Sequence, residues 1–266
     1  MKQTFQKLTL VATVVTIFAS CNKEEDSNYT PPPPPAVNSV IVSAAGDSAG
    51  IVAKLNEFRL LAGDPLNGAP GATTGRREVN WDGVPANLTN ANNFPFDFFG
   101  SADPALGNGR KRGLIMNNTG TSFRVDTTDF SEIDASYASQ FEAFSRKRLF
   151  ISVGNNVTEV TFKLPGTTTE AFVKGFAVIF SDVDLANVTT VEYFNGTKSI
   201  GVFKAAIAPQ GFSFVGVSFP NEKVTRVKIT SGNGVLAGGV KDISNGGTKD
   251  LVAMDDFLYS EPQPMQ

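Results

Sequence analysis

The sequence predicts an all-β protein, built as an antiparallel β-sandwich, and three observations lead to this prediction. Short β-prone runs recur through the second half of the chain, separated by Gly, Asn, Asp and Pro. Signals for helices are sparse. The chain also contains 22 Phe against one Trp and four Tyr, and Phe packs into cores without needing a polar partner.

The N-terminal residues have the layout of an export signal. Lys2 and Lys7 precede a mostly apolar run, 8–18, which is followed by two small residues and by Cys21, the only cysteine in the chain. A run of about ten apolar residues is too short for the ~20 that a transmembrane helix needs. We therefore expect residues 1–20 to be a signal peptide.

This arrangement resembles the bacterial lipobox, in which a signal peptidase cuts before the cysteine and acyl chains such as palmitate are attached to it. The resemblance implies lipidation at Cys21 and a membrane partner through that anchor, although Phe18 is bulkier than the usual Leu. Residues 23–26, Lys-Glu-Glu-Asp, resemble a signal for the outer face of the outer membrane. The alternative for these residues is a solvated charge run.

A tether is expected at residues 21–48, in front of a β-sandwich domain at 49–262. Residues 31–35 are five consecutive prolines, which form a stiff polyproline II spacer or, alternatively, a proline-recognition ligand. The formal net charge is −3, and removal of the signal peptide makes the chain more acidic. Because no Lys/Arg-rich tract is present, we expect no nucleic-acid partner.

Eight runs are predicted as strands, in chain order 149–153, 157–164, 172–180, 189–194, 199–203, 212–219, 224–230 and 251–259. The stretch 130–148 has some helical propensity, and we expect it to be a loop with one or two turns. Strands at this spacing indicate a sandwich rather than a βαβ fold.

Two stretches carry a family resemblance. They are 75–85, which contains Arg-Arg-Glu-Val-Asn-Trp-Asp-Gly, and 175–184 continuing through 191–194 to 254–257, Met-Asp-Asp-Phe. Together they look like a family of secreted bacterial β-sandwich proteins, jelly-roll-like in character, with no established activity. The second stretch is also similar to carbohydrate-binding jelly rolls.

That second resemblance implies a structural calcium ion. In those modules an acidic residue on the last strand meets an early loop, which here gives Asp255 or Asp256 with Asp64 and Asn67. Calcium takes six to eight oxygen ligands. Asp182 and Asp184 form an alternative pair, since residues two apart in a strand point to one side. The competing interpretation is that all these acids cap turns or face solvent.

Residues 76–85 are the strongest candidate for a functional surface. If they form a strand, Arg77, Val79 and Trp81 share one face and the intervening polar residues share the other. An indole stacks well on a sugar ring, and the polar face can bind hydroxyl groups. The ligand-binding candidates are Arg76, Arg77, Glu78, Asn80, Trp81 and Asp82. The alternative is an Arg-Glu-Asp network that closes the sandwich over a buried Trp81.

Catalysis has few available routes. The chain has no histidine, which excludes Ser-His-Asp and Cys-His catalysis and His-ligated zinc. The expected lipidation of Cys21 would also make its thiol unavailable for catalysis or metal binding. We assign no catalytic residue. Glu78 and Asp82 are the alternative acid–base pair, but residues four apart in a strand lie ~13 Å apart, farther than the about 5–9.5 Å of glycosidases.

The expected function is a non-catalytic glycan-binding or adhesion module on an outer-membrane lipoprotein, facing the cell exterior. Its partner would be a polysaccharide or a surface protein. Two alternatives remain open: a carboxylate-dependent polysaccharide hydrolase or lyase, and a structural surface or matrix protein.

Overall fold

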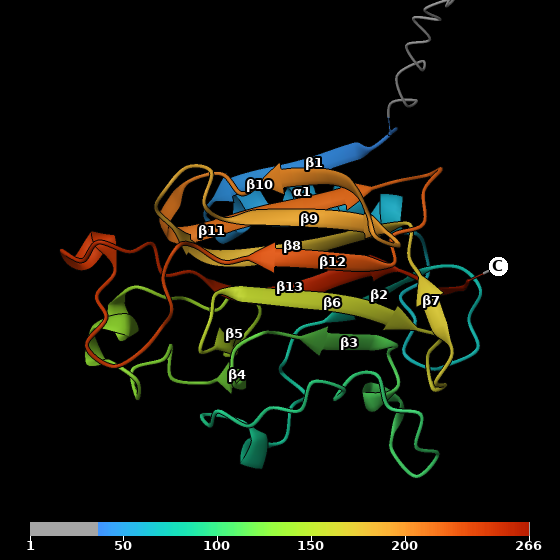
Figure 1. Ribbon diagram of the computed structural model, residues 1–266, viewed down its shortest axis with the longest axis horizontal. Helices are drawn as coiled ribbons and strands as arrows, with labels where there is room; N and C mark the ends of the chain where they lie inside the picture. The colour runs from blue at the N-terminus through green and yellow to red at the C-terminus, as the bar shows by residue number, and fades with distance from the viewer. Residues whose placement is uncertain (1–36, 266) are drawn as a thin grey trace, which may run out of the picture. The chain divides into compact units, whose positions relative to one another are not determined.

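Seven strands form the first antiparallel sheet in the computed structural model, which describes residues 37–265 (Figure 1). Six of them follow the order β1, β11, β8, β13, β5, β4, and β2 also pairs with β13. Their bounds are β1 (Val40–Gly46), β2 (Arg76–Val79), β4 (Ser122–Asp126), β5 (Leu149–Val153), β8 (Gly175–Val183), β11 (Ala208–Ser218) and β13 (Ala253–Ser260).

A second antiparallel sheet of seven strands faces the first one. Its order is β10, β9, β12, β6, β7, β14, and β3 also pairs with β6. The bounds are β3 (Leu114–Asn117), β6 (Val157–Lys163), β7 (Glu170–Phe172), β9 (Thr190–Asn195), β10 (Lys198–Lys204), β12 (Arg226–Thr230) and β14 (Gln263–Pro264). The predicted all-β sandwich is confirmed, and each of the eight predicted runs contains a strand.

Within residues 37–265, one α-helix, α1 (Ser48–Ala62), covers the outer face of the first sheet, and four short 3₁₀ helices lie in loops. These are η1 (Ala86–Leu88), η2 (Asn108–Arg110), η3 (Ala135–Ser139) and η4 (Ile243–Asn245). The stretch 130–148 is a loop with one such turn, as predicted. The α-helix was not predicted, although Ile51, Leu55, Phe58 and Ala62 are buried at helical spacing.

Strand β8 shows how the layers meet. All nine of its residues are buried, because successive side chains point to opposite faces and both faces are covered. Phe176, Val178 and Phe180 belong to the main core between the sheets. Ala177 and Ile179 belong to a second cluster under α1.

The folded part begins earlier than predicted. Strand β1 pairs with β11 over its whole length, from Val40↔Ser218 to Gly46↔Phe212, so residues 40–48 are part of the domain and not of a tether. The compact unit that holds the described residues starts at Ala36. Sequence reasoning missed β1 because Val42 is its only buried residue, which leaves no apolar alternation to detect.

The N-terminal predictions lie outside the described residues. They comprise the signal peptide at 1–20, lipidation at Cys21, the charge run at 23–26 and the proline spacer at 31–35. Within residues 37–265, no helix has both the length and the apolar character that crossing a membrane requires.

Candidate functional site

Strand β2 places the residues of the predicted ligand face, and it does so at an irregular point of the first sheet. Strand β13 pairs with β5 through Met254↔Phe150 and with β2 from Phe257↔Val79 to Ser260↔Arg76. The register of β13 against β8 shifts between Met254 and Phe257. The shift marks a bulge at Asp255 and Asp256, where β13 changes its partner from β5 to β2.

Trp81 is core, not a binding platform. It is 1% exposed, and its indole is stacked on Phe150 with ring centroids 4.1 Å apart. The indole N–H donates to the Asp255 carbonyl at 2.8 Å. The prediction that Trp81 stacks on a sugar is therefore wrong, and the alternative of a buried Trp81 is confirmed.

The side chain of Arg77 is also buried. Its side chain is 0% exposed and forms a salt bridge with Glu261, itself 1% exposed, at 2.7 Å. Arg77 also donates to the Ala69 carbonyl. Arg77 and Val79 face inward and Arg76 and Glu78 face outward, so the predicted alternation of β2 is confirmed while Arg77 is not accessible to a ligand.

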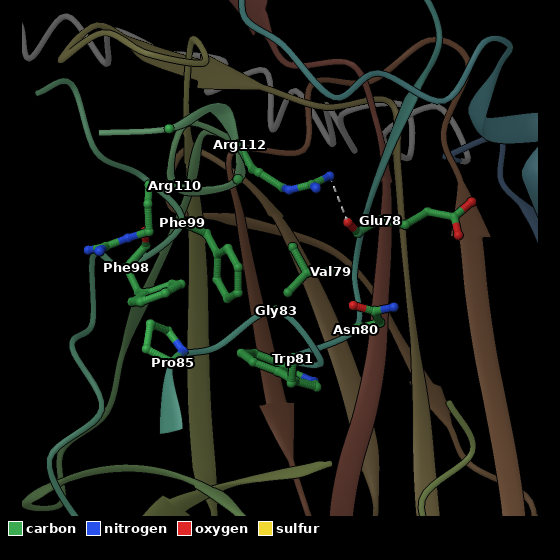
Figure 2. A pocket seen from close by; sticks show the side chains of 12 residues that line it. Glu78, Val79, Asn80, Trp81, Gly83, Pro85, Phe98, Phe99, Arg110 and Arg112 are labelled. Atoms are coloured by element: carbon green, nitrogen blue, oxygen red, sulfur yellow. Dashed lines mark hydrogen bonds between the residues drawn. The ribbon is translucent and has the colours of Figure 1, made fainter. Parts of the chain in front are cut away.

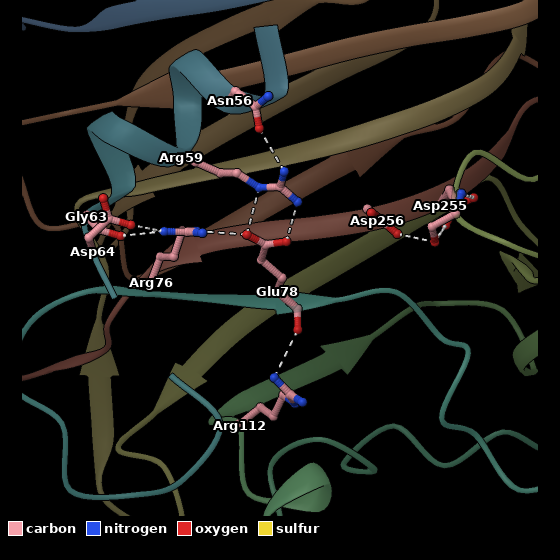
Figure 3. A network of polar contacts seen from close by, with 10 residues as sticks. Asn56, Arg59, Gly63, Asp64, Arg76, Glu78, Arg112, Asp255 and Asp256 are labelled. Atoms are coloured by element: carbon pink, nitrogen blue, oxygen red, sulfur yellow. Dashed lines mark hydrogen bonds and ion pairs between the residues drawn. The ribbon is translucent and has the colours of Figure 1, made fainter. Parts of the chain in front are cut away.

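Glu78 is the centre of an arginine network (Figure 3). Arg59 donates to both of its carboxylate oxygens at 2.9 and 2.7 Å, and Arg76 donates at 2.8 Å. Burial by itself raises the pKa of Glu78, but the hydrogen bonds and charges of Arg59 and Arg76 outweigh burial and lower the pKa. Glu78 is thus an ionised structural carboxylate that joins α1 to β2.

Asn80 and Asp82 lie beyond the end of β2. Asn80 is exposed, and within the described part of the chain its side chain has no hydrogen-bond partner. Asp82 lies 3.8 Å from the guanidinium of Arg146, which is 84% exposed. Of the six predicted ligand-binding residues, Asn80 is the most available to a ligand.

The residues of the first predicted calcium site lie in two separate parts of the structure. Asp64 contacts Arg76, and the amide of Asn67 donates to Thr74 and Glu261. Asp255 and Asp256 lie at the bulge of β13, on the far side of Glu78 from Asp64 (Figure 3). The structure does not bring the two halves of this set together, because β2 and Glu78 lie between them.

Asp255 and Asp256 instead bind the segment that precedes β5. Asp255 accepts from the backbone N–H groups of Phe144 and Ser145 and from the Ser145 hydroxyl, and that hydroxyl also lies 2.6 Å from Asp256. Burial, followed by the charge of Asp256, raises the pKa of Asp255 well above its ordinary value. This pair is satisfied by protein groups.

The alternative metal pair is brought together with a third residue that the sequence did not reveal. Single carboxylate oxygens of Asp182, Asp184 and Asp242 lie within 4.8 Å of one another. Asp242 comes from the long segment between β12 and β13, 58 residues beyond Asp184 in numbering. A local spacing pattern could not have identified it.

Two cavities of about 330 and 390 Å³ adjoin at Glu78, Asn80 and Arg112, and we call them together the β2 groove. Figure 2 shows the first of them. One half is walled by Pro85, Phe98 and Arg110, among others, and the other by α1, Ser145 and Asp256. Sequence reasoning missed this second wall because it comes from loops and a helix distant in the chain.

Two arginines of the groove are held in different ways. The guanidinium of Arg110 lies 3.7 Å from the centre of the Phe98 ring and donates to the Phe98 carbonyl at 2.7 Å. Arg112 donates from Nη1 to the Glu78 carbonyl at 3.1 Å. Within residues 37–265, the other N–H groups of Arg112 have no protein acceptor, so they are available to a ligand.

Comparisons of the chain with family models, with curated proteins and with solved structures found no match.

Proposed function

We propose that the protein is a lipid-anchored surface protein whose β-sandwich binds a glycan, without catalysis, in the β2 groove. The observation that carries the proposal is the pair of adjoining cavities that meet at Asn80 and Arg112. Both residues offer polar groups without protein partners, on a strand end and a loop that the core holds in place. Pre-positioned hydrogen-bonding groups in a concave site are typical of small-molecule and saccharide recognition.

The charges of the groove favour an acidic polysaccharide. Arg59, Arg110 and Arg112 line it, against Glu78 and Asp256. Since Arg59 is already paired with Glu78, Arg112 is the group best placed to bind a carboxylate of a uronic acid. A guanidinium can bind a carboxylate through two parallel hydrogen bonds.

The hydrolase or lyase alternative receives less support from the same residues. A glycosidase acid must hold its proton near neutral pH. The lowered pKa of Glu78 and its hydrogen bonds to Arg59 and Arg76 oppose that role. Asp82 would have to act with a partner other than Glu78.

Surface location remains part of the proposal. The lipobox-like run that ends at Cys21 and the Lys-Glu-Glu-Asp run at 23–26 support an acylated protein on the outer membrane, facing outward. The five prolines at 31–35 support a stalk that lifts the domain from the membrane.

Binding is tested with the full-length protein in detergent, by calorimetric titration with uronate-containing and neutral oligosaccharides. We expect binding of the uronate-containing ligands, weakened at least tenfold by Arg112→Lys, which keeps the charge but loses the two-pronged geometry. Asn80→Ala should weaken binding to both ligand classes.

Lys198→Gln is the matched control, because Lys198 is an exposed cation on β10 of the other sheet. It should leave binding unchanged. Equal losses in Arg112→Lys and Lys198→Gln would show non-specific attraction of a polyanion and would contradict the groove. Absence of binding to every saccharide, together with self-association of the protein, would favour the structural or matrix alternative.

A further inference from the structure

The aspartate cluster, defined as Asp182, Asp184 and Asp242, lies at one end of the first sheet. Asp182 is near the end of β8 and Asp184 follows that strand, while Asp242 belongs to the 231–252 segment that leads from β12 to β13. Figure 1 shows this segment, in orange, reaching out beyond the end of the sandwich. One carboxylate oxygen from each of the three residues lies within 4.8 Å of the others.

Two of the three residues of the cluster are buried, Asp184 is partly buried, and three of the carboxylate oxygens lack a protein donor. Asp182 and Asp242 are both 0% exposed. Oδ2 of Asp182 and both carboxylate oxygens of Asp184 are buried without a hydrogen-bond partner. A buried carboxylate oxygen without a partner is costly, so these three oxygens together require a compensating group.

Two other buried carboxylates of this protein have a cationic partner. Glu261 is paired with Arg77, and Asp126 is paired with Arg124. Among the ion pairs found within residues 37–265, none involves Asp182, Asp184 or Asp242. Within the described part of the chain, no ion pair supplies the cluster with the positive charge that Glu261 and Asp126 receive from arginine.

Backbone donors hold two of the three carboxylates in position. The N–H of Gln210 donates to Oδ1 of Asp182 at 2.7 Å, which leaves Oδ2 directed elsewhere. Asp182 has a left-handed backbone with φ 66°, a conformation that Asp adopts more readily than most residues other than Gly. The N–H of Leu251 donates to Asp242 at 3.3 Å. The carboxylates of Asp182 and Asp242 are therefore pre-positioned.

Asp250 is not one of the three residues of the cluster, but it holds the backbone of the cluster residue Asp184 in place. Its two oxygens accept from the backbone N–H groups of Asp184 and Leu185 at 3.2 and 2.9 Å. This contact fixes the chain direction just after β8 and joins it to the end of the 231–252 segment. The segment is thus attached to the chain directly after β8, next to the cluster.

We propose that the aspartate cluster binds a calcium ion through Asp182, Asp184 and Asp242, and that the ion fastens the 231–252 segment to the end of β8. An all-oxygen, carboxylate-rich donor set suits a hard cation, and calcium tolerates irregular geometry better than magnesium does. Water would complete the six to eight ligands that calcium takes.

The direct test is calorimetric titration of calcium into EDTA-treated, full-length protein in detergent, followed by thermal unfolding. We expect one calcium site per chain. At a free calcium concentration one hundred times Kd, ligand binding to the folded state should raise the melting midpoint by about 5–10 °C. Magnesium should give a smaller shift at the same concentration.

Two isosteric variants connect the binding to the cluster. Asp184→Asn and Asp242→Asn should each abolish the calcium-dependent rise, and in EDTA both should melt at or above the wild-type midpoint because an unpaired charge has been removed. Asp64→Asn is the matched control, since Asp64 is an exposed acid paired with Arg76. It should respond to calcium as the wild type does.

Three results would overturn the proposal. The first is wild-type protein that binds no calcium while Asp184→Asn and Asp242→Asn raise the midpoint, which would indicate protons shared among the carboxyl groups. The second is a magnesium response equal to that of calcium. The third is a calcium response that persists in both cluster variants, which would place the ion elsewhere.

Discussion

Trp81 shows how one residue connects the strands at the bulge. Its backbone has φ 61°, which turns the chain at the end of β2 and directs the indole into the core. There the ring stacks on Phe150 of β5 and its N–H binds the carbonyl of Asp255 in β13. Three strands therefore depend on this side chain.

We expect Trp81→Ala to lower the free energy of unfolding by about 3–5 kcal/mol, the usual cost of truncating a large buried aromatic residue. Trp81→Phe should cost less, because it keeps the aromatic contact and loses only the hydrogen bond to Asp255. Urea unfolding followed by circular dichroism measures both changes. Loss of glycan binding in a stably folded Trp81→Phe variant would contradict a purely structural role.

Asp255 and Asp256 place two carboxyl groups side by side inside the bulge. Burial is the largest cause of the raised pKa of both residues, and for Asp255 the neighbouring charge of Asp256 is the next. The folded protein therefore keeps a proton at this pair over a pH range in which the unfolded chain, with an ordinary Asp pKa of about 3.9, has lost it.

This proton makes stability depend on pH. Because the folded state binds more protons than the unfolded state, the stability contributed by Asp255 is complete below about pH 4 and is lost as pH rises through the folded-state pKa. Asp255→Asn removes this titration, so its unfolding free energy should fall less between pH 4 and pH 8 than that of the wild type. Urea unfolding across this range measures the difference. An unchanged slope would show that Asp255 does not carry the proton.

At the scale of elements, β1 and α1 act together on the first sheet. β1 pairs with the edge of β11, and α1 packs Phe58 against Phe214 of β11 with ring centroids 6.1 Å apart. Gly216 of β11 gives the Phe58 ring its space, since a Cβ there would lie 2.7 Å from it. The helix begins at the Asp47 cap, where the carboxylate accepts from Gly50 at 2.9 Å.

A truncation distinguishes the observed domain boundary from the one predicted from sequence. Protein that starts at residue 49 loses β1 and the cap of α1, which leaves the β11 edge unpaired and prone to associate with other chains. We expect it to aggregate or to melt well below protein that starts at Ala36. Thermal unfolding and size-exclusion chromatography compare the two. Equal stability would show that β1 contributes little to the fold.

At the scale of the whole molecule, three hydrophobic clusters hold the layers together. The largest fills the space between the sheets and the second lies under α1. In the third, Tyr137 and Phe141 of the 130–148 loop pack with Leu236 of the 231–252 segment, and the Tyr137 hydroxyl binds the carbonyls of Ala237 and Val240. This third cluster and the proposed calcium ion would hold the same segment.

We predict that the whole chain is attached to a membrane through Cys21. In a Gram-negative host, we expect mature protein that begins at Cys21 and is heavier than the bare chain by its acyl groups. Cys21→Ser should block acylation and move the protein out of the detergent-soluble membrane fraction. Intact-mass spectrometry and membrane fractionation measure these effects. Unmodified wild-type protein in the soluble fraction would contradict lipidation.

The amino-acid sequence alone predicted the sandwich, the eight main strands and the inward and outward faces of β2. These features depend on local alternation and on turn residues, which neighbouring positions carry. It did not reveal β1, because one buried residue in an edge strand leaves no pattern. Helix α1 was missed although its apolar spacing was present in the sequence.

Which side chains meet at each site depends on the three-dimensional packing of the chain. Trp81 and Arg77 became core because Phe150 and Glu261, distant in the chain, cover them. Asp242 joined Asp182 and Asp184 because a loop returns to the end of β8. Sites of this kind are assembled from segments far apart in sequence, and the packing of the layers, which no local pattern encodes, determines their composition.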